Sequence, residues 1–348
     1  MIMKDKRETA IIEFIKKNND CSSKEIFDGV KLSISYATIK RILSKLISEN
    51  FIETIGKGKG TKYIISSAYE LIQPISINNY YEKEIDEREI KESFNFQLIT
   101  NVLNRYNIFS DNELIKLTDL QETYRKKSSQ LTELEYKKEL ERLAIDLSWK
   151  SSQIEGNTYS LLETERLLKE KETASGKTKE EAVMLLNHKD AIDLIIDHPD
   201  YLIPISISRI EDIHEILVKE LSIENNLRKR RIGISGTNYR PLDNEFQIIE
   251  ALNYSCSLIN DKESIFEKAL LALALISYIQ PFMDGNKRTA RIVSNAILIN
   301  NNYCPISFRT VDSIDYKKAM LLFYEQNNIF NFKEIFIDQF EFAVRTYF

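Results

Sequence analysis

Two apolar runs, separated by a short polar segment, constrain the fold of this chain more than any other feature. Residues 269–279 and 292–299 are predominantly apolar, which is typical of helices that are buried on most sides. The segment between them contains Pro281 and Gly285, and these residue types interrupt regular structure. The pattern therefore predicts a helix, a tight loop and a second helix in the core of a mainly helical protein. The first run has eleven residues, too few to cross a membrane.

The loop brings charged side chains to the start of the second predicted helix. Free backbone N–H groups and the positive end of the helix dipole favour an anion there. Gly285 allows the backbone to approach a ligand closely, and Asp284 offers a carboxylate for a divalent cation. Arg288 and Arg291 lie three residues apart on one helical face. The loop predicts a site for a metal-bound polyphosphate, and an ordinary charged helix start at the surface is the alternative.

Residues 280–291 read Gln-Pro-Phe-Met-Asp-Gly-Asn-Lys-Arg-Thr-Ala-Arg. They closely resemble the signature of the Fic family, His-Pro-Phe-x-(Asp/Glu)-Gly-Asn-x-Arg-x-x-Arg. Members of that family mostly transfer AMP from ATP to a hydroxyl side chain of a target protein. The resemblance implies ATP and Mg²⁺ as cofactors, with Asp284 as the metal ligand. It assigns the catalytic positions to Gln280, Asp284 and Asn286, and nucleotide binding to Gly285, Asn286, Lys287, Arg288 and Arg291.

The first position of the signature differs, because Gln280 stands where the family has a histidine. In the family that histidine is the general base that takes the proton of the attacking hydroxyl. A glutamine amide has no basic nitrogen at neutral pH and cannot accept that proton. His188, His198 and His214 lie far away in the sequence, and we expect them to be core or surface residues. The prediction is an intact nucleotide site with weak or absent AMP transfer.

A second segment, Ser151-Ser152-Gln153-Ile154-Glu155-Gly156, follows a predicted helix over residues 135–150, and Gly156 is a helix stop. It resembles the inhibitory motif of the same family, (Ser/Thr)-x-x-x-Glu-(Gly/Asn). The resemblance assigns inhibition to Ser151, Glu155 and Gly156. It implies that Glu155 pairs with Arg291 and keeps this arginine from orienting the γ-phosphate of ATP. A solvated helix end is the alternative for such a glutamate.

A third segment, residues 230–241, alternates apolar and polar side chains and then turns at Gly236. This pattern predicts a short β-hairpin. Its place upstream of the signature resembles the family's flap, which holds a target segment by strand pairing. The flap candidates are Gly236, Thr237, Asn238 and Tyr239. An ordinary surface hairpin would show the same pattern.

The first 66 residues predict a separate unit. Amphipathic patterns predict helices over residues 9–18, 23–30 and 35–50, and a Gly-Lys-Gly-Lys-Gly turn predicts a β-hairpin over residues 51–65. Three helices and a two-stranded wing resemble a winged helix-turn-helix module. The unit carries 13 Lys and Arg against 8 Asp and Glu, a net charge of +5, whereas the remaining 282 residues carry 35 against 45, a net charge of −10.

This charge asymmetry favours contact with nucleic-acid phosphates. In the helix-turn-helix interpretation, the third helix enters the major groove and the wing reaches the backbone or the minor groove. The expected DNA contacts are Tyr36, Thr38, Lys40 and Arg41 on the helix and Lys57 and Lys59 on the wing. A protein-docking unit with a solvated lysine-rich turn is the alternative.

The expected organisation has three parts: a winged helix-turn-helix module over residues 1–66, a linker and helical extension over 67–119, and a Fic domain with its inhibitory helix over 120–348. A chain of 348 residues with 43% apolar residues is long and apolar enough for more than one domain. The expected fold is mainly α, a helical bundle with a small β-hairpin flap and the N-terminal module. Capping-box spacings predict helix starts at Ser160, Thr178, Ser208 and Ser264.

The three cysteines are scattered without metal-ligand spacing, and the N-terminus lacks the apolar core of a signal peptide. We therefore expect a cytoplasmic protein with reduced thiols and no membrane partner. Analogy with other helical Fic-like domains suggests a homodimer. Two functions remain: a Fic-type AMP transferase inhibited by Glu155, and a nucleotide-sensing DNA-binding regulator without transferase activity. The family resemblance favours the first function, and the missing base favours the second.

Overall fold

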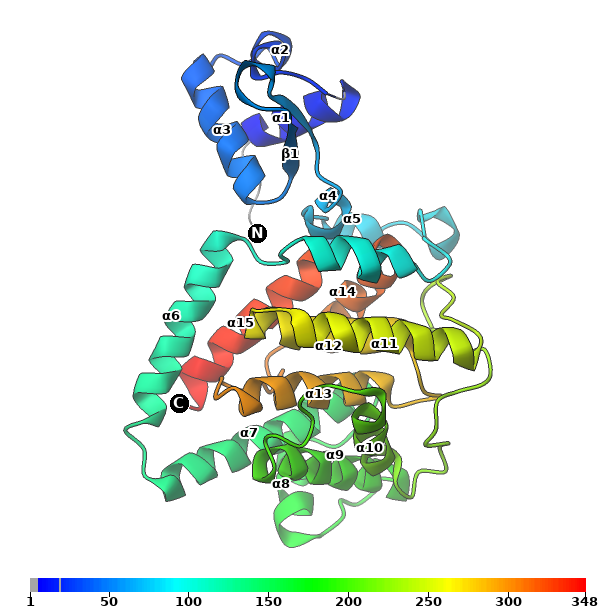
Figure 1. Ribbon diagram of the computed structural model, residues 1–348. Coiled ribbons are helices and arrows are strands. Elements are labelled where there is room, and N and C mark those ends of the chain that lie inside the picture. The colour runs from blue at the N-terminus through cyan, green and yellow to red at the C-terminus, as the bar shows by residue number, and fades with distance from the viewer. Residues whose placement is uncertain (1–5, 19) are drawn as a thin grey trace.

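The computed structural model describes residues 6–18 and 20–348, and all of their side chains except that of Lys59. The described chain is mainly helical, as predicted, and its two strands form a single antiparallel sheet. Figure 1 shows a small N-terminal unit that stands on a larger helical body. Among the described helices, none combines the length and the apolar character that a membrane span requires.

The N-terminal unit consists of three helices and a hairpin. The helices are α1 (Lys6–Lys17), α2 (Ser23–Gly29) and α3 (Tyr36–Ser48), and the strands are β1 (Ile52–Ile55) and β2 (Lys62–Ile65), with a 3₁₀ turn η1 (Gly58–Gly60) between them. Ile52 pairs with Ile65 and Ile55 with Lys62, so the predicted hairpin is present. Apolar side chains from all three helices, such as Ile11, Ile26 and Leu43, are buried between them.

The connection to the body contains short helical segments, namely α4 (Tyr69–Ile72), α5 (Ile77–Tyr81), η2 (Ile85–Glu87) and the π-helix η3 (Leu98–Leu103). It leads into α6 (Asp111–Ser128), which packs against the last helix of the chain, α15 (Phe330–Thr346). The boundary predicted between residues 119 and 120 falls inside α6, which is one continuous helix.

The core of the body is the predicted pair of apolar helices. Helix α12 (Ile265–Ile279) and helix α13 (Asn286–Asn300) pack along each other (Figure 1). Every residue from Ala269 to Ile279 is buried, as the apolar run predicted. The helices around this pair are α7 (Glu133–Ile154), α8 (Leu161–Glu170), α9 (Lys179–Asp197), α10 (Ile207–Val218), α11 (Glu245–Asp261) and α14 (Ser313–Gln326).

Three of the four predicted helix starts are confirmed and one is wrong. Ser160, Thr178 and Ser264 each cap a helix through the side-chain oxygen. Ser208, in contrast, lies inside the first turn of α10, because Ser206 is the cap and accepts a hydrogen bond from the backbone N–H of Arg209. The extended backbone of Ser206, with φ −144°, suits a cap position.

The predicted hairpin over residues 230–241 is wrong. The described segment turns at Gly236, with φ +88°, but no strand ladder forms across the turn. The N–H of Arg240 instead donates to the carbonyl of Glu92 at 2.8 Å, and the buried Tyr239 donates its hydroxyl to the carbonyl of Tyr278 at 3.1 Å. The segment is therefore held by contacts with the body rather than by cross-strand bonds of its own.

Candidate functional site

The loop between α12 and α13 has a conformation that its sequence dictates. Gln280 caps the C-terminus of α12 and Gly285 caps the N-terminus of α13, and both residues adopt left-handed backbone angles, with φ +52° and +81°. A Cβ atom at Gly285 would lie 3.3 Å from the ring of His214, so both the backbone angle and the close packing favour glycine there.

The side chain of Asn286 fixes the loop from inside. Its Oδ1 accepts a hydrogen bond from the N–H of Phe282 at 2.8 Å, and its Nδ2 donates to the carbonyl of Phe282 at 2.9 Å and to Oε1 of Gln280 at 3.1 Å. The asparagine is buried. Because one amide satisfies both backbone groups of Phe282, the loop is held in one conformation at the start of α13.

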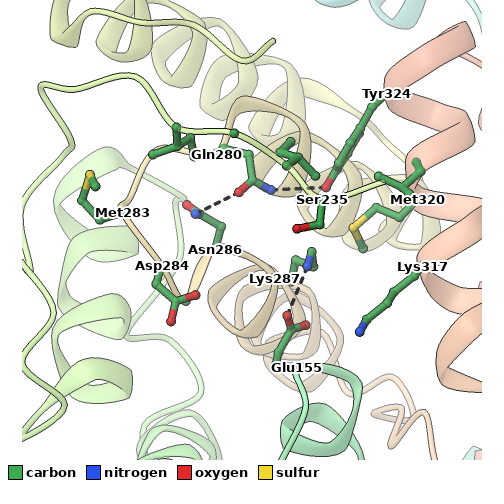
Figure 2. A pocket seen from close by; sticks show the side chains of 15 residues that line it. Glu155, Ser235, Gln280, Met283, Asp284, Asn286, Lys287, Lys317, Met320 and Tyr324 are labelled. Atoms are coloured by element: carbon green, nitrogen blue, oxygen red, sulfur yellow. Dashed lines mark hydrogen bonds and ion pairs between the residues drawn. The ribbon is translucent and has the colours of Figure 1, made fainter. Parts of the chain in front are cut away.

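Gln280, in the position of the family's histidine, is engaged at both ends of its amide. Its Nε2 donates to the carbonyl of Ser277 at 2.6 Å and lies 3.4 Å from the hydroxyl of Tyr324, while its Oε1 accepts from Asn286 (Figure 2). Neither amide atom is basic at neutral pH. Gln280 is therefore a structural support of the loop and offers no group that can take a proton.

Two histidines that are distant in the sequence lie near the start of α13. The ring of His214 stacks on Phe282 with 3.6 Å between ring centres, and its nitrogens face the carbonyls of Asp284 and Asn225 at 2.9 and 3.0 Å. His188 is buried against the hydroxyl of Ser151 at 2.6 Å. Burial lowers the pKa of both rings, and Arg291 and Arg288 lower that of His188 further. Neither histidine lines the cavity described below.

The two arginines of the loop motif are buried behind the start of α13. Arg288 donates to the carbonyl of Leu217 at 3.2 Å and lies 3.5 Å from the carboxylate of Asp284. Arg291 uses Nη2 for an ion pair, whereas its Nε and Nη1 have no hydrogen-bond acceptor among the described residues. Buried N–H groups are usually satisfied, so the free donors of Arg291 are suited to an anion.

The partner of Arg291 is Glu155, at the C-terminal end of α7. The carboxylate lies 2.5 Å from Nη2 of Arg291 and 3.1 Å from Nζ of Lys287. Burial opposes the ionisation of Glu155, but the two cations outweigh this effect and lower its pKa. Gly156 follows with φ +103° and ends the helix. The structure thus places Glu155 against Arg291, which is the contact that the family resemblance implied.

A cavity of about 360 Å³ opens in front of the loop. Four parts of the chain line it: Glu155, residues 232–235, residues 283–287 with Gln280, and the side chains of Lys317, Met320, Leu321 and Tyr324 from α14 (Figure 2). The volume lies in the range of small-molecule sites. With the N-terminus of α13 and two lysines at its wall, the cavity favours an anionic ligand.

Six of the predicted site residues meet at this cavity, whereas Ser151, Gly156, Arg288 and Arg291 do not line it. Gln280, Asp284, Gly285, Asn286, Lys287 and Glu155 line it. The flap candidates do not: the carbonyl of Gly236 accepts from Arg88, Asn238 contacts Asp86, and Tyr239 is buried. The Thr237 hydroxyl accepts from the N–H of Tyr239. Residues 232–235, just before the predicted turn, line the cavity instead. The assignment of residues 236–239 to a target flap stays a prediction.

The sequence also missed the contribution of α14. Lys317 and Tyr324 lie seven residues apart on one side of this helix, and both reach the cavity. Seven residues are two helical turns, so the spacing was visible. It was not distinctive, because any amphipathic helix contains such pairs.

Asp284 is suited to a metal ion that arrives with a phosphate ligand. Its carboxylate is 65% exposed at the cavity and is paired only loosely, at 3.5 Å, with Arg288. Mg²⁺ commonly binds through one or two carboxylates together with phosphate oxygens and water. The described residues contain no group of three or more His, Cys, Asp or Glu side chains that could enclose a metal. The donor set therefore fits a phosphate-bound Mg²⁺ rather than a metal held by protein alone.

The predicted DNA contacts lie on α3 and the β1–β2 turn. Tyr36, Lys40, Arg41 and Lys57 are exposed. Thr38 is half-buried, and its hydroxyl contacts Ser35 at 2.9 Å, within the helix cap. The side chain of Lys59 lies outside the described residues. The exposed residues leave a basic surface open to a partner.

The comparisons with known proteins agree with this geometry. The model of the Fic/DOC family matches residues 204–298. A protein adenylyltransferase Fic from Nematostella vectensis is 34% identical over 175 residues, which cover 48% of this chain and 40% of that protein. Another from Aedes aegypti is 28% identical over 162 residues, which cover 44% of this chain and 32% of that protein. The matches thus span less than half the length of these relatives.

Solved structures show the same fold. Fic-1 from C. elegans has a TM-score of 0.58 at 19% identity, with 68% of this chain and 72% of that chain covered. A Fic family protein from Desulfovibrio desulfuricans has a TM-score of 0.58 at 20% identity, with 69% and 74% covered. The loop and its flanking helices α12 and α13 lie within or at the edge of the matched segment. The chain therefore contains a domain of the Fic/DOC family.

Proposed function

We propose that the cavity binds ATP together with Mg²⁺. The start of α13 supplies free N–H groups for phosphate oxygens, Lys287, Arg288 and Arg291 supply positive charge, and Asp284 supplies the metal ligand. The named activity of the relatives, protein adenylyltransferase, requires such a nucleotide site. When bound, Mg²⁺ would neutralise phosphate charge beside Asp284.

Glu155 inhibits this site in our proposal, and its ion pair with Arg291 is the observation that carries the proposal. The carboxylate occupies the arginine that would otherwise orient the terminal phosphate. It also places negative charge beside Lys287, at 3.1 Å. A triphosphate must therefore compete with Glu155 for the same two cations, and displacing this carboxylate is the step that activates the protein.

The chemistry that the family relation suggests is AMP transfer to a protein hydroxyl. The hydroxyl oxygen attacks the α-phosphorus of ATP, the bond to the β-phosphate oxygen breaks, and pyrophosphate leaves. The hydroxyl proton needs an acceptor, and Gln280 provides none. Loss of a general base costs about two to four orders of magnitude in rate, so we propose that the wild-type protein transfers AMP very slowly.

A second function is favoured by the amide of Gln280, which is committed to Ser277 and Asn286 at 2.6 and 3.1 Å. A site that keeps its anion-binding groups while its base is replaced by a structural amide is suited to sensing a nucleotide. The exposed Lys40, Arg41 and Lys57 would let the N-terminal unit bind DNA. In this alternative, the protein is a nucleotide-responsive DNA-binding regulator without transferase activity.

Incubation with α-labelled ATP and Mg²⁺ separates the two functions. Four proteins are compared: wild type, Glu155→Gly, Gln280→His and the double variant. Histidine tolerates the left-handed backbone of position 280 better than most residues. We expect the double variant to label itself at least about a hundredfold faster than Glu155→Gly. Strong labelling of the wild-type protein would contradict the proposed role of Gln280, and equal, negligible labelling of all four would favour the regulator.

A further inference from the structure

A segment outside the matched Fic/DOC residues supports the cavity walls without lining the cavity itself. Residues 80–95, here called the strap, run between the N-terminal unit and η3 and pass over both α14 and the segment that carries residues 232–235. The N–H of Lys91 donates to the carbonyl of Glu325 at 2.8 Å, and the carbonyl of Glu92 accepts from the N–H of Arg240 at 2.8 Å. The strap thus binds two of the four walls of the cavity to each other.

The centre of this contact is a buried ion pair between Arg88 of the strap and Glu325 of α14. Nη1 of Arg88 lies 3.1 Å from each carboxylate oxygen, and the side chains are 3% and 0% exposed. The hydroxyl of Tyr80 donates to the same carboxylate at 2.6 Å. The guanidinium also lies 5.0 Å from the ring centre of Tyr81. A buried carboxylate without its cation would be costly, so the pair fixes the strap on α14.

The other end of the same guanidinium reaches the cavity wall. Nη2 of Arg88 donates to the carbonyl of Gly236 at 3.1 Å, directly after Ser235, which lines the cavity. A Cβ atom at Gly236 would lie 3.4 Å from Leu321, another cavity residue. The described segment has no strand ladder of its own. Its position therefore depends on such external contacts, and this one involves a charged, buried donor.

We propose that Arg88 is a positioning residue of the nucleotide site: it holds residues 232–235 against α14 and thereby completes the wall of the cavity. The inference rests on the proposed function, because it assumes that the cavity binds ATP. Arginine is required rather than a cation in general. Its planar guanidinium donates in two directions at once, whereas the single ammonium of lysine is a compact charge on a flexible stem.

The charge-conserving variant Arg88→Lys tests this role. Lysine keeps a cation for Glu325 but cannot also hold the carbonyl of Gly236. We expect the thermal midpoint of unfolding to stay much closer to wild type than that of Arg88→Ala. We expect the affinity for Mg²⁺-ATP to fall about tenfold, since a hydrogen bond from a charged buried donor is lost. Amide hydrogen exchange in residues 232–238 should become faster.

Arg240→Lys is the matched control. It makes the same change at another contact between the strap and the segment 230–241, but Arg240 forms an exposed pair with Glu92 at 3.5 Å, with side chains 62% and 61% exposed. The affinity of Arg240→Lys for Mg²⁺-ATP and the amide hydrogen exchange of its residues 232–238 should equal those of wild type. Calorimetry is performed in the wild-type and Glu155→Gly backgrounds.

The outcomes separate the two proposals. If Arg88→Lys matches wild type in ATP affinity and in exchange of residues 232–238, the positioning role is overturned while ATP binding stands. If neither background binds ATP, the proposed function fails and the role in nucleotide binding fails with it. In that case, faster exchange in Arg88→Lys would still report that the strap holds the segment.

Discussion

Glu155 and Arg291 form an ion pair of 2.5 Å although 136 residues separate them in the chain. The arginine side chain is fully buried, and that of the glutamate is 17% exposed. Removing one partner of a buried pair leaves the other charge without compensation. A ligand that brings its own negative charge can replace Glu155 as the partner of Arg291. The pair is therefore a structural contact. In our proposal, the carboxylate of Glu155 also competes with the nucleotide for Arg291.

The first prediction concerns the pH dependence of this pair. Burial opposes ionisation of Glu155, but Arg291 and Lys287 lower its pKa below the ordinary value of 4.5. A lowered pKa in the folded state means that the stabilisation is fully present above pH 4.5 and is lost as the pH falls through the folded value. Glu155→Gln should be less stable than wild type by about 3 kcal/mol at pH 7. Below pH 4.5 this difference should shrink.

Urea unfolding of both proteins over a pH series measures this difference. The control is Glu165→Gln, which removes an exposed pair with Lys169 and should cost at most about 1 kcal/mol. A wild-type advantage that stays constant down to the acid limit of folding would show that the carboxylate charge does not stabilise the protein.

The second prediction concerns Asn286, whose amide satisfies both backbone groups of Phe282. Asn286→Ala leaves these buried groups without partners and should destabilise the protein by at least about 2 kcal/mol. It should also abolish measurable ATP binding at concentrations that saturate the Glu155→Gly protein. Thermal unfolding and calorimetry test the two effects.

Asn301→Ala is the control for this experiment, because Asn301 lies at the opposite end of α13 and donates one bond to the carbonyl of Ile297. It should leave ATP binding unchanged. If Asn286→Ala binds ATP as tightly as Asn301→Ala, the loop is not the phosphate site.

The third prediction concerns the N-terminal unit. Arg41 is exposed on α3, and in the DNA-binding proposal it contacts the duplex. Arg41→Ala should weaken binding to duplex DNA. It should also reduce the magnitude of the slope of log K against log salt concentration by about one. Fluorescence anisotropy over a salt series measures both. Lys138→Ala, an exposed lysine of α7, should bind as wild type does. Identical curves for Arg41→Ala and Lys138→Ala would contradict a DNA-binding role for α3.

The parts of the site that the sequence predicted are those encoded locally. Pro281 and Gly285 specify a tight loop between two apolar helices, and Gly285 is required by its backbone angle and by the ring of His214. The contact of Glu155 with Arg291 is long-range, and family resemblance rather than spacing predicted it. The N-terminal helices followed from amphipathic patterns, and the hairpin followed from a glycine-rich turn.

The parts that the sequence did not predict depend on tertiary contacts. Residues 232–235 alternate like a strand, yet the N–H of the nearby Arg240 pairs with Glu92 of the strap, a partner that no local pattern reveals. Tyr324 and Lys317 reach the cavity only because α14 packs beside the loop. Arg88 and Glu325 are ordinary charged residues in sequence, and their burial is visible only in the fold.

Calorimetric titration of Mg²⁺-ATP into wild type and Glu155→Gly shows whether Glu155 competes with the nucleotide for Arg291. Both proteins keep the loop, Asn286 and the arginines, and they differ only in the carboxylate that competes for Arg291. We predict that Glu155→Gly binds ATP at least about tenfold more tightly, which corresponds to about 1.4 kcal/mol. AMP, which lacks the terminal phosphates, should bind both proteins equally. Equal ATP affinities, or binding to neither protein, would show that Glu155 does not compete with the nucleotide for Arg291.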